Sequence, residues 1–316
     1  MSIYLKNHCG NEHGKYVKTI RLTDAMRQAM ERLEIMGKTR TKEIYNSTLK
    51  SFMAFRVGKD LQLCRLTSDI IMQYERYLYV RRGVSRNTSS FYMRVLRAVY
   101  NHAVEEGVIV DCHPFRHVYT GVDKTIKRAL PLSAIRKIMQ LNLDAQPRLA
   151  FARDLFMFSF YTRGMSFVDM AYLKKSDLKN GVLTYKRRKT GQCLRIKWEE
   201  CMQTVINRYG CGADGCLLPI IARENIDKRT QYQNALSITN ILLKKVGAMA
   251  GIETPLTTYV ARHSWASIAR YKNIPLSVIS EGMGHENERT TRIYLASLES
   301  SVVDDANSTL LKALME

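Results

Sequence analysis

Three short stretches in the C-terminal third of the chain decide the fold: TTYVARH at residues 257–263, MGH at residues 283–285 and TTRIY at residues 290–294. They bring together an arginine, histidines and a tyrosine, and Tyr294 follows His285 by nine residues. Each part alone carries little information, because an Arg-His pair usually lies on a helix surface or cap and a single tyrosine usually packs in a core. Their combination at this spacing predicts one shared site.

Upstream of these stretches, one segment departs from the helical pattern that prevails in residues 129–316. Apolar and basic residues alternate along residues 194–198, which is typical of a half-buried strand. The preceding Lys-Thr-Gly-Gln at residues 189–192 has the composition of a turn. We therefore expect a small β-hairpin with a basic tip inside an otherwise helical domain, with Pro147 in the first turn of one of its helices.

The N-terminal part has the apolar spacing of a separate helical bundle over residues 21–112. One helical stripe is formed by Tyr45, Leu49 and Phe52, and another runs from Tyr92 to Ala103. Arg94 and Arg97 fall off this second stripe, so that this helix has one apolar and one basic side.

Three further segments complete the predicted organisation. Residues 1–20 lack periodicity and are expected to form an N-terminal arm. Residues 113–128 have the composition of a linker between two domains and end in basic residues, namely Lys124, Lys127 and Arg128. Residues 304–316 carry Leu310, Leu311 and Leu314 at helical spacing, which indicates a small C-terminal docking helix.

Charge points to a polyanionic partner. The 316 residues include 49 Lys and Arg against 29 Asp and Glu, a net charge of +20. A surplus of this size favours phosphate backbones, since each neutralised phosphate releases condensed counterions. No apolar stretch reaches bilayer length and no leader is evident, so we expect a cytoplasmic protein.

Neither metal nor nucleotide is expected at the site. The seven cysteines lack paired short spacings, and Cys211 and Cys216 have no second ligand pair at zinc-site distance. A P-loop and an evident carboxylate cluster are also missing from the sequence.

The three stretches resemble the tyrosine recombinase or phage integrase family, whose catalytic domain has an Arg-His helix start, a Leu-Gly-His-type turn and a nucleophilic tyrosine nine residues later. Residues 130–297 resemble that catalytic domain, and the helical bundle resembles the family's SAM-like core-binding domain. The resemblance implies a mainly α protein: a core-binding bundle and an α-rich catalytic domain with a small β-hairpin, forming a C-shaped clamp on double-stranded DNA. It also implies a monomer that becomes a tetramer on synapsed sites.

By this resemblance the chain is a site-specific recombinase that cleaves and rejoins DNA. Tyr294 is the nucleophile and forms a 3′-phosphotyrosyl link, and Arg262 clamps the nonbridging phosphate oxygens. Lys189 on the hairpin donates a proton to the leaving 5′ oxygen. His285 hydrogen-bonds the phosphate, and His263 helps to position the site. The energy of the broken bond is kept in the protein link, so no cofactor is required.

Two positions depart from the family pattern. Tyr259 replaces the histidine three residues before Arg262, and a phenol is a poor general base, which leaves His263 and His285 as imidazoles near the nucleophile. The first catalytic arginine of the family is expected three residues before Asp169, where this sequence has Ser166. Arg163 is the first choice to replace it, with Gly164 giving the backbone freedom, and Arg187 on the hairpin is the alternative.

Two other functions fit the same scaffold: a DNA-binding regulator that has lost catalysis, and a type IB topoisomerase. In the recombinase interpretation, Arg94, Arg97 and the basic residues of the linker are expected to contact phosphates, which positions the protein without specifying a sequence.

Overall fold

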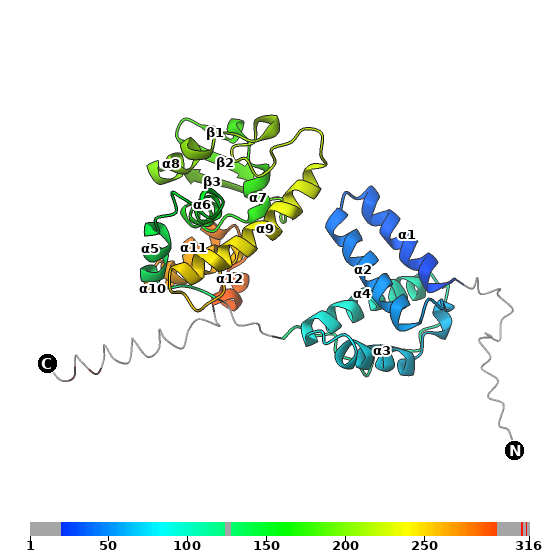
Figure 1. Cartoon of the computed structure of the whole chain (residues 1–316). Helices are drawn as coiled ribbons and strands as arrows, with labels where there is room; N and C mark the ends of the chain where they lie inside the picture. Colours follow the sequence, from blue (N-terminus) through cyan, green and yellow to red (C-terminus); the bar gives the residue numbers. More distant parts are fainter. Residues whose placement is uncertain (1–19, 124–127, 296–310, 312–313, 315–316) are drawn as a thin grey trace, which may run out of the picture. The chain divides into compact units, whose positions relative to one another are not determined.

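The computed structural model describes residues 20–123 and 128–295, together with residues 311 and 314 (Figure 1). The chain divides into two compact units, residues 1–124 and residues 125–316. Each unit has its own hydrophobic core. The described part is mainly α-helical with one small sheet, as the sequence predicts.

Over residues 20–123 the first unit is a bundle of four α-helices: α1 (Leu22–Ile35), α2 (Thr39–Phe55), α3 (Ser68–Val80) and α4 (Arg86–Glu105). Hydroxyl side chains define two of the helix starts: Thr67 accepts a hydrogen bond from the amide of Ile70, and Ser85 accepts one from the amide of Thr88. The aromatic rings of Phe52 and Tyr74 meet edge to face in the centre of the bundle, 5.0 Å apart.

This unit extends beyond residue 112, where the sequence predicts the linker to begin. Phe115 and Val118 are buried in its core, and the guanidinium of Arg97 donates to the hydroxyl of Thr120 at 2.9 Å. These apolar residues lie in an irregular segment without helical period, so a periodicity argument does not detect them. Lys124 and Lys127 lie outside the described residues, whereas Arg128 is exposed.

The second unit has a longer order of elements. Its described α-helices are α5 (Leu132–Gln140), α6 (Pro147–Tyr161), α7 (Phe167–Tyr172), α8 (Glu200–Tyr209), α9 (Lys228–Met249), α10 (Thr258–Tyr271), α11 (Leu276–Met283) and α12 (Glu288–Leu295). Between α7 and α8 lies an antiparallel sheet in the order β1 (Leu178–Lys179), β2 (Val182–Lys186) and β3 (Cys193–Lys197). Strands β2 and β3 form the predicted hairpin, with Tyr185 opposite Leu194.

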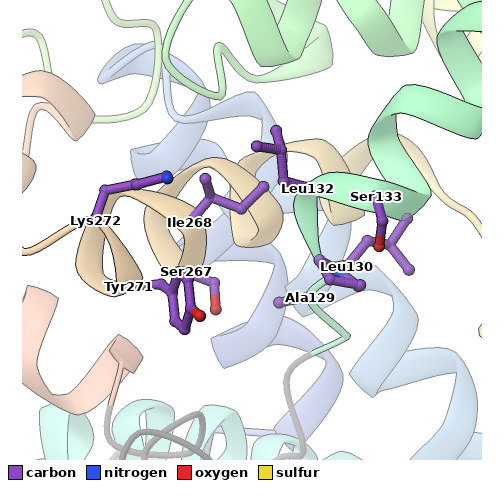
Figure 2. A pocket seen from close by; sticks show the side chains of 9 residues that line it. Ala129, Leu130, Leu132, Ser133, Ser267, Ile268, Tyr271 and Lys272 are labelled. Atoms are coloured by element: carbon purple, nitrogen blue, oxygen red, sulfur yellow. The ribbon is translucent and has the colours of Figure 1, made fainter. Parts of the chain in front are cut away.

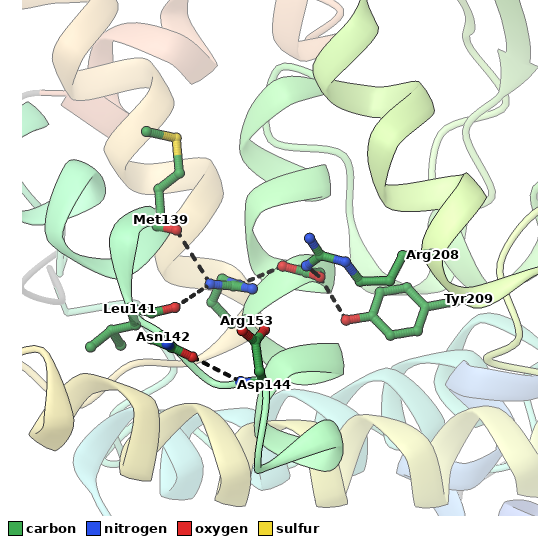
Figure 3. A network of polar contacts seen from close by, with 8 residues as sticks. Met139, Leu141, Asn142, Asp144, Arg153, Arg208 and Tyr209 are labelled. Atoms are coloured by element: carbon green, nitrogen blue, oxygen red, sulfur yellow. Dashed lines mark hydrogen bonds and ion pairs between the residues drawn. The ribbon is translucent and has the colours of Figure 1, made fainter.

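Helix α6 is the centre of this unit and packs against α5, α8, α9 and α10. It is buried on nearly all sides. Its buried residues are mostly apolar but include the ion pair of Arg153 and Asp154. Arg153 donates to Asp154 and to the carbonyls of Met139 and Leu141, and Asp154 also accepts hydrogen bonds from Arg208 and Tyr209 (Figure 3). Burial and the neighbouring carboxylate raise the pKa of Tyr209 to about 12. The network ties α6 to the end of α5 and to α8.

A cavity of about 500 Å³ lies between the segment before α5 and the second half of α10 (Figure 2). Leu130, Ile268 and Tyr271 are among its lining residues, and no candidate site residue with a described side chain lines it. Within the described ranges no helix is long and apolar enough to cross a membrane, and no group of His, Cys, Asp and Glu suits a metal ion. Of the predicted C-terminal helix only Leu311 and Leu314 are described, both exposed; Leu310 and the arm 1–19 are outside that part.

Candidate active site

The turn between α6 and α7 presents Arg163 to the site. Arg163 and Gly164 both have left-handed backbone conformations, with φ of +60° and +75°. The carbonyl of Gly164 accepts a hydrogen bond of 2.9 Å from Nη1 of Arg262. A Cβ atom at Gly164 would lie 2.7 Å from the Cα of Arg262, so only glycine allows this close approach.

Ser166, at the register where the family has its first arginine, is instead the N-cap of α7. Its hydroxyl accepts from the amide of Asp169 and donates to one carboxylate oxygen of that residue at 2.6 Å. The other carboxylate oxygen of Asp169 accepts from the amide of Arg188 at 2.9 Å. Asp169 therefore connects the start of α7 to the turn of the hairpin that carries Lys189.

Arg262 lies in the first half of α10 and is 4% exposed. Besides its bond to Gly164, its Nη2 donates to the carbonyl of Met283 at 2.6 Å and lies 3.3 Å from Nε2 of His285. These contacts fix the guanidinium between the α6–α7 turn and the end of α11.

The turn from α11 to α12 holds His285. Gly284 adopts a left-handed conformation with φ of +63°, and its carbonyl accepts a hydrogen bond from Nη1 of Arg187. A Cβ atom at Gly284 would lie 2.9 Å from Cδ of Arg187. On the other side of the imidazole, Nδ1 of His285 is 2.7 Å from the hydroxyl of Thr291 on α12.

Electrostatics show that the cationic side chains converge on this turn. Burial and, in decreasing order, the charges of Arg262, Arg187 and Lys189 together lower the pKa of His285 to about 4. The imidazole is therefore neutral near pH 7. Burial raises the pKa of the Tyr185 phenol, while Arg187, Arg262 and Arg163 all act to lower it. Three guanidinium groups thus lie near one buried ring.

The structure brings together five candidate residues around the 283–285 turn: Arg163, Arg187, Lys189, Arg262 and His285. Lys189 is exposed in the hairpin turn.

The backbone of Tyr294 lies in α12, one helical turn after Thr291, and its side chain lies outside the part of the chain that the structure describes. His263 is buried, and its ring meets that of the half-exposed Tyr259 edge to face at 4.7 Å.

Comparison with known families covers both units. The model of the phage integrase SAM-like domain matches residues 21–118, and that of the phage integrase family matches residues 129–301, more than half of the chain. The chain belongs to the phage integrase family. As such it is a tyrosine-type site-specific recombination enzyme.

Relatives and solved structures agree with this assignment. The integrase is 25% identical to tyrosine recombinase XerC of Syntrophus aciditrophicus over 84% of this chain and 89% of the relative. It is 21% identical to tyrosine recombinase XerD of Pseudomonas aeruginosa over 80% and 85%. The fold is similar to a lambda integrase dimer bound to a core site (TM-score 0.66, 18% identity, 87% and 95% covered) and to the Tn1549 transposon integrase with a circular-intermediate DNA (TM-score 0.64, 16% identity, 87% and 95% covered).

Sequence reasoning missed two residues that hold the site of the integrase together. Asp169 marks the register of the first arginine in the sequence, and in the structure its carboxylate accepts from the amide of Arg188 in the hairpin turn. Thr291 lies within the quoted TTRIY stretch, six residues after His285 and three before Tyr294. Its position one helical turn before the nucleophile candidate was the available signal, because residues at this spacing share a helix face.

Proposed function

We propose that this integrase cleaves and rejoins double-stranded DNA at specific sites through a 3′-phosphotyrosyl intermediate, with Tyr294 as nucleophile. The observation that supports it best is the convergence of Arg163, Arg187, Lys189 and Arg262 on the turn of His285, one short helix away from Tyr294. Fixed guanidinium groups are the donors that a phosphodiester under attack requires.

The proposed reaction conserves the number of phosphate ester bonds. The phenolic oxygen of Tyr294 bonds to phosphorus and the bond from phosphorus to the 5′ oxygen breaks, with Lys189 giving its proton to that oxygen. Arg262 and a second arginine stabilise the charge on the nonbridging oxygens. Because a phenol has an ordinary pKa of about 10, Tyr294 needs a proton acceptor. We propose His263 for that role, because His285 is the imidazole proposed to hydrogen-bond the phosphate.

The partner of this reaction is double-stranded DNA, and the working assembly is a tetramer on paired sites. The net charge of +20 supports the first part. A solved lambda integrase tetramer bound to a Holliday junction, similar in fold to this chain, supports the second. Arg94, Arg97, Lys124, Lys127 and Arg128 are the proposed phosphate contacts. Arg94 and Arg97 are both half-exposed on α4, and the guanidinium of Arg97 is held by its hydrogen bond to the hydroxyl of Thr120.

The nucleophile is tested with a nicked suicide substrate carrying the target site. The parent protein is expected to form an SDS-resistant protein–DNA adduct, and Tyr294→Phe is expected to form none, because a phenyl ring has no oxygen to attack phosphorus. Tyr271→Phe is the matched control, since Tyr271 is an exposed tyrosine of the same unit. Equal failure of parent and Tyr294→Phe would contradict the enzymatic proposal.

A second test distinguishes the two arginines. Arg187 is buried and holds the Gly284 carbonyl, whereas Arg163 is half-exposed with Nη1 3.4 Å from the carbonyl of Arg195. We propose Arg163 as the second phosphate ligand. Arg163→Ala is expected to lose cleavage and keep its melting temperature, while Arg187→Ala lowers the melting temperature as well. Full cleavage by Arg163→Ala would remove that residue from the site.

A further inference from the structure

Thr291 is a fully buried threonine on α12, the helix that also carries Tyr294. Its hydroxyl lies 2.7 Å from Nδ1 of His285. The opposite nitrogen, Nε2, faces Arg262 at 3.3 Å. The imidazole is thus held at both ends, by α10 on one side and by α12 on the other.

These two contacts fix where the proton of the imidazole lies. A guanidinium group donates hydrogen bonds and cannot accept them, so Nε2 of His285 accepts from Arg262. The proton of the neutral ring is then on Nδ1, which donates to the hydroxyl of Thr291. The lowered pKa of His285 agrees with a neutral ring.

A phosphodiester in the site reverses this requirement. Phosphate oxygens only accept hydrogen bonds, so Nε2 must carry a proton in order to bind one. The neutral ring then has its lone pair on Nδ1 and needs a donor there. A hydroxyl group serves both states because it can donate as well as accept. A carboxylate would hold the proton on Nδ1, and an alkyl group would bind neither form.

We propose that Thr291 is a positioning residue of the active site, whose hydroxyl orients the His285 ring and lets it exchange its Nδ1–H form for its Nε2–H form when DNA phosphate enters. The inference rests on the proposed function, because it needs a phosphodiester beside Nε2. It also couples the imidazole to α12, since the seating of Thr291 orients the ring and Tyr294 follows on the same helix.

The test compares Thr291→Val, which removes the hydroxyl and keeps the shape, with Thr291→Ser, which retains it. The matched control is Thr290→Val, because Thr290 is exposed and its hydroxyl bonds only Asn287 in the described part of the chain. Single-turnover cleavage of a suicide substrate is expected to slow by about 10-fold in Thr291→Val, the loss of about one hydrogen bond to a group in the site. Thr291→Ser and Thr290→Val are expected to cleave like the parent.

A second readout does not depend on activity. By NMR of the DNA-free protein, the Nδ1–H proton of His285 should exchange slowly with solvent in the parent, Thr291→Ser and Thr290→Val, and fast in Thr291→Val, because Arg262 keeps the proton on Nδ1 in all four proteins and the Thr291 hydroxyl accepts from it. A Thr291→Val protein that keeps the slow Nδ1–H exchange of the parent, or its cleavage rate, overturns the proposal. Thr291→Ala replaces it if valine prevents folding. A parent that fails to cleave contradicts the proposed function, while the exchange measurement still decides the role of Thr291.

Discussion

Gly164 is the residue at which the backbone of one element touches the catalytic arginine candidate of another. Its left-handed conformation alone disfavours most side chains. An added Cβ would also lie only 2.7 Å from the Cα of Arg262, which excludes even the methyl group of alanine. The precise location of Arg262 therefore depends on a position that has no side chain of its own.

Replacing this glycine gives a prediction with an internal control. Gly164→Ala is expected to lower the free energy of unfolding by about 3 kcal/mol, of which roughly 1–2 kcal/mol is left-handed strain and the rest overpacking. Gly181 has a similar φ of +70° and nothing within 4 Å of the added Cβ, so Gly181→Ala should show the strain alone. Chemical denaturation measures both. Equal losses in the two variants would argue against the close approach.

At this scale the sequence predicts the chemistry better than the geometry. Arg262, His285 and Lys189 lie together, as their motifs suggest. Arg163 also reaches the site, from a turn whose positive φ values leave no periodic trace in the sequence. The choice between Arg163 and Arg187 as second phosphate ligand depends on which carbonyl each guanidinium contacts. That contact is determined by packing, which the sequence does not show.

Among the elements, the turn of the β2–β3 hairpin carries Lys189, the proposed proton donor. Asp169 holds this turn through the amide of Arg188. Asp169→Asn replaces one accepting oxygen with a donor, so amide exchange across residues 187–192 is expected to increase and cleavage to slow. Asp177→Asn is the control, since Asp177 caps a different turn through the amide of Lys174 at 2.8 Å. Hydrogen exchange by mass spectrometry compares the two variants, and unchanged exchange in Asp169→Asn would refute this coupling.

Elements with a clear period or turn composition are predictable, and short or irregular ones are not. The alternation in residues 194–198 predicts β3, and Pro147 is the first residue of α6. Strand β1 has two residues, which is too short for an alternating pattern, and its pairing with β2 cannot be predicted from the local sequence.

For the whole molecule, the two separate cores predict two independently folding parts. Fragments 1–124 and 125–316 are each expected to melt cooperatively, because among the residues that the structure describes each core cluster draws on one unit. Fragment 125–316 should still form the adduct, with weaker DNA binding and a shallower dependence on salt than the full chain, because fewer phosphates are neutralised. Circular dichroism and binding titrations at several salt concentrations check this. A fragment 125–316 that stays unfolded would contradict it.

The two units also differ in how soon during synthesis each helix is followed by the helices that pack against it. The bundle of the first unit is complete after about 120 residues of synthesis, since all its helices are neighbours in sequence. Helix α6, buried on nearly every side, emerges well before α9 and α10, which cover it. More than 80 further residues must be synthesised before its apolar surface can be covered, since α6 ends at Tyr161, α9 at Met249 and α10 at Tyr271. During that interval α6 lacks the helices that cover it in the folded unit, which makes the nascent chain prone to aggregation.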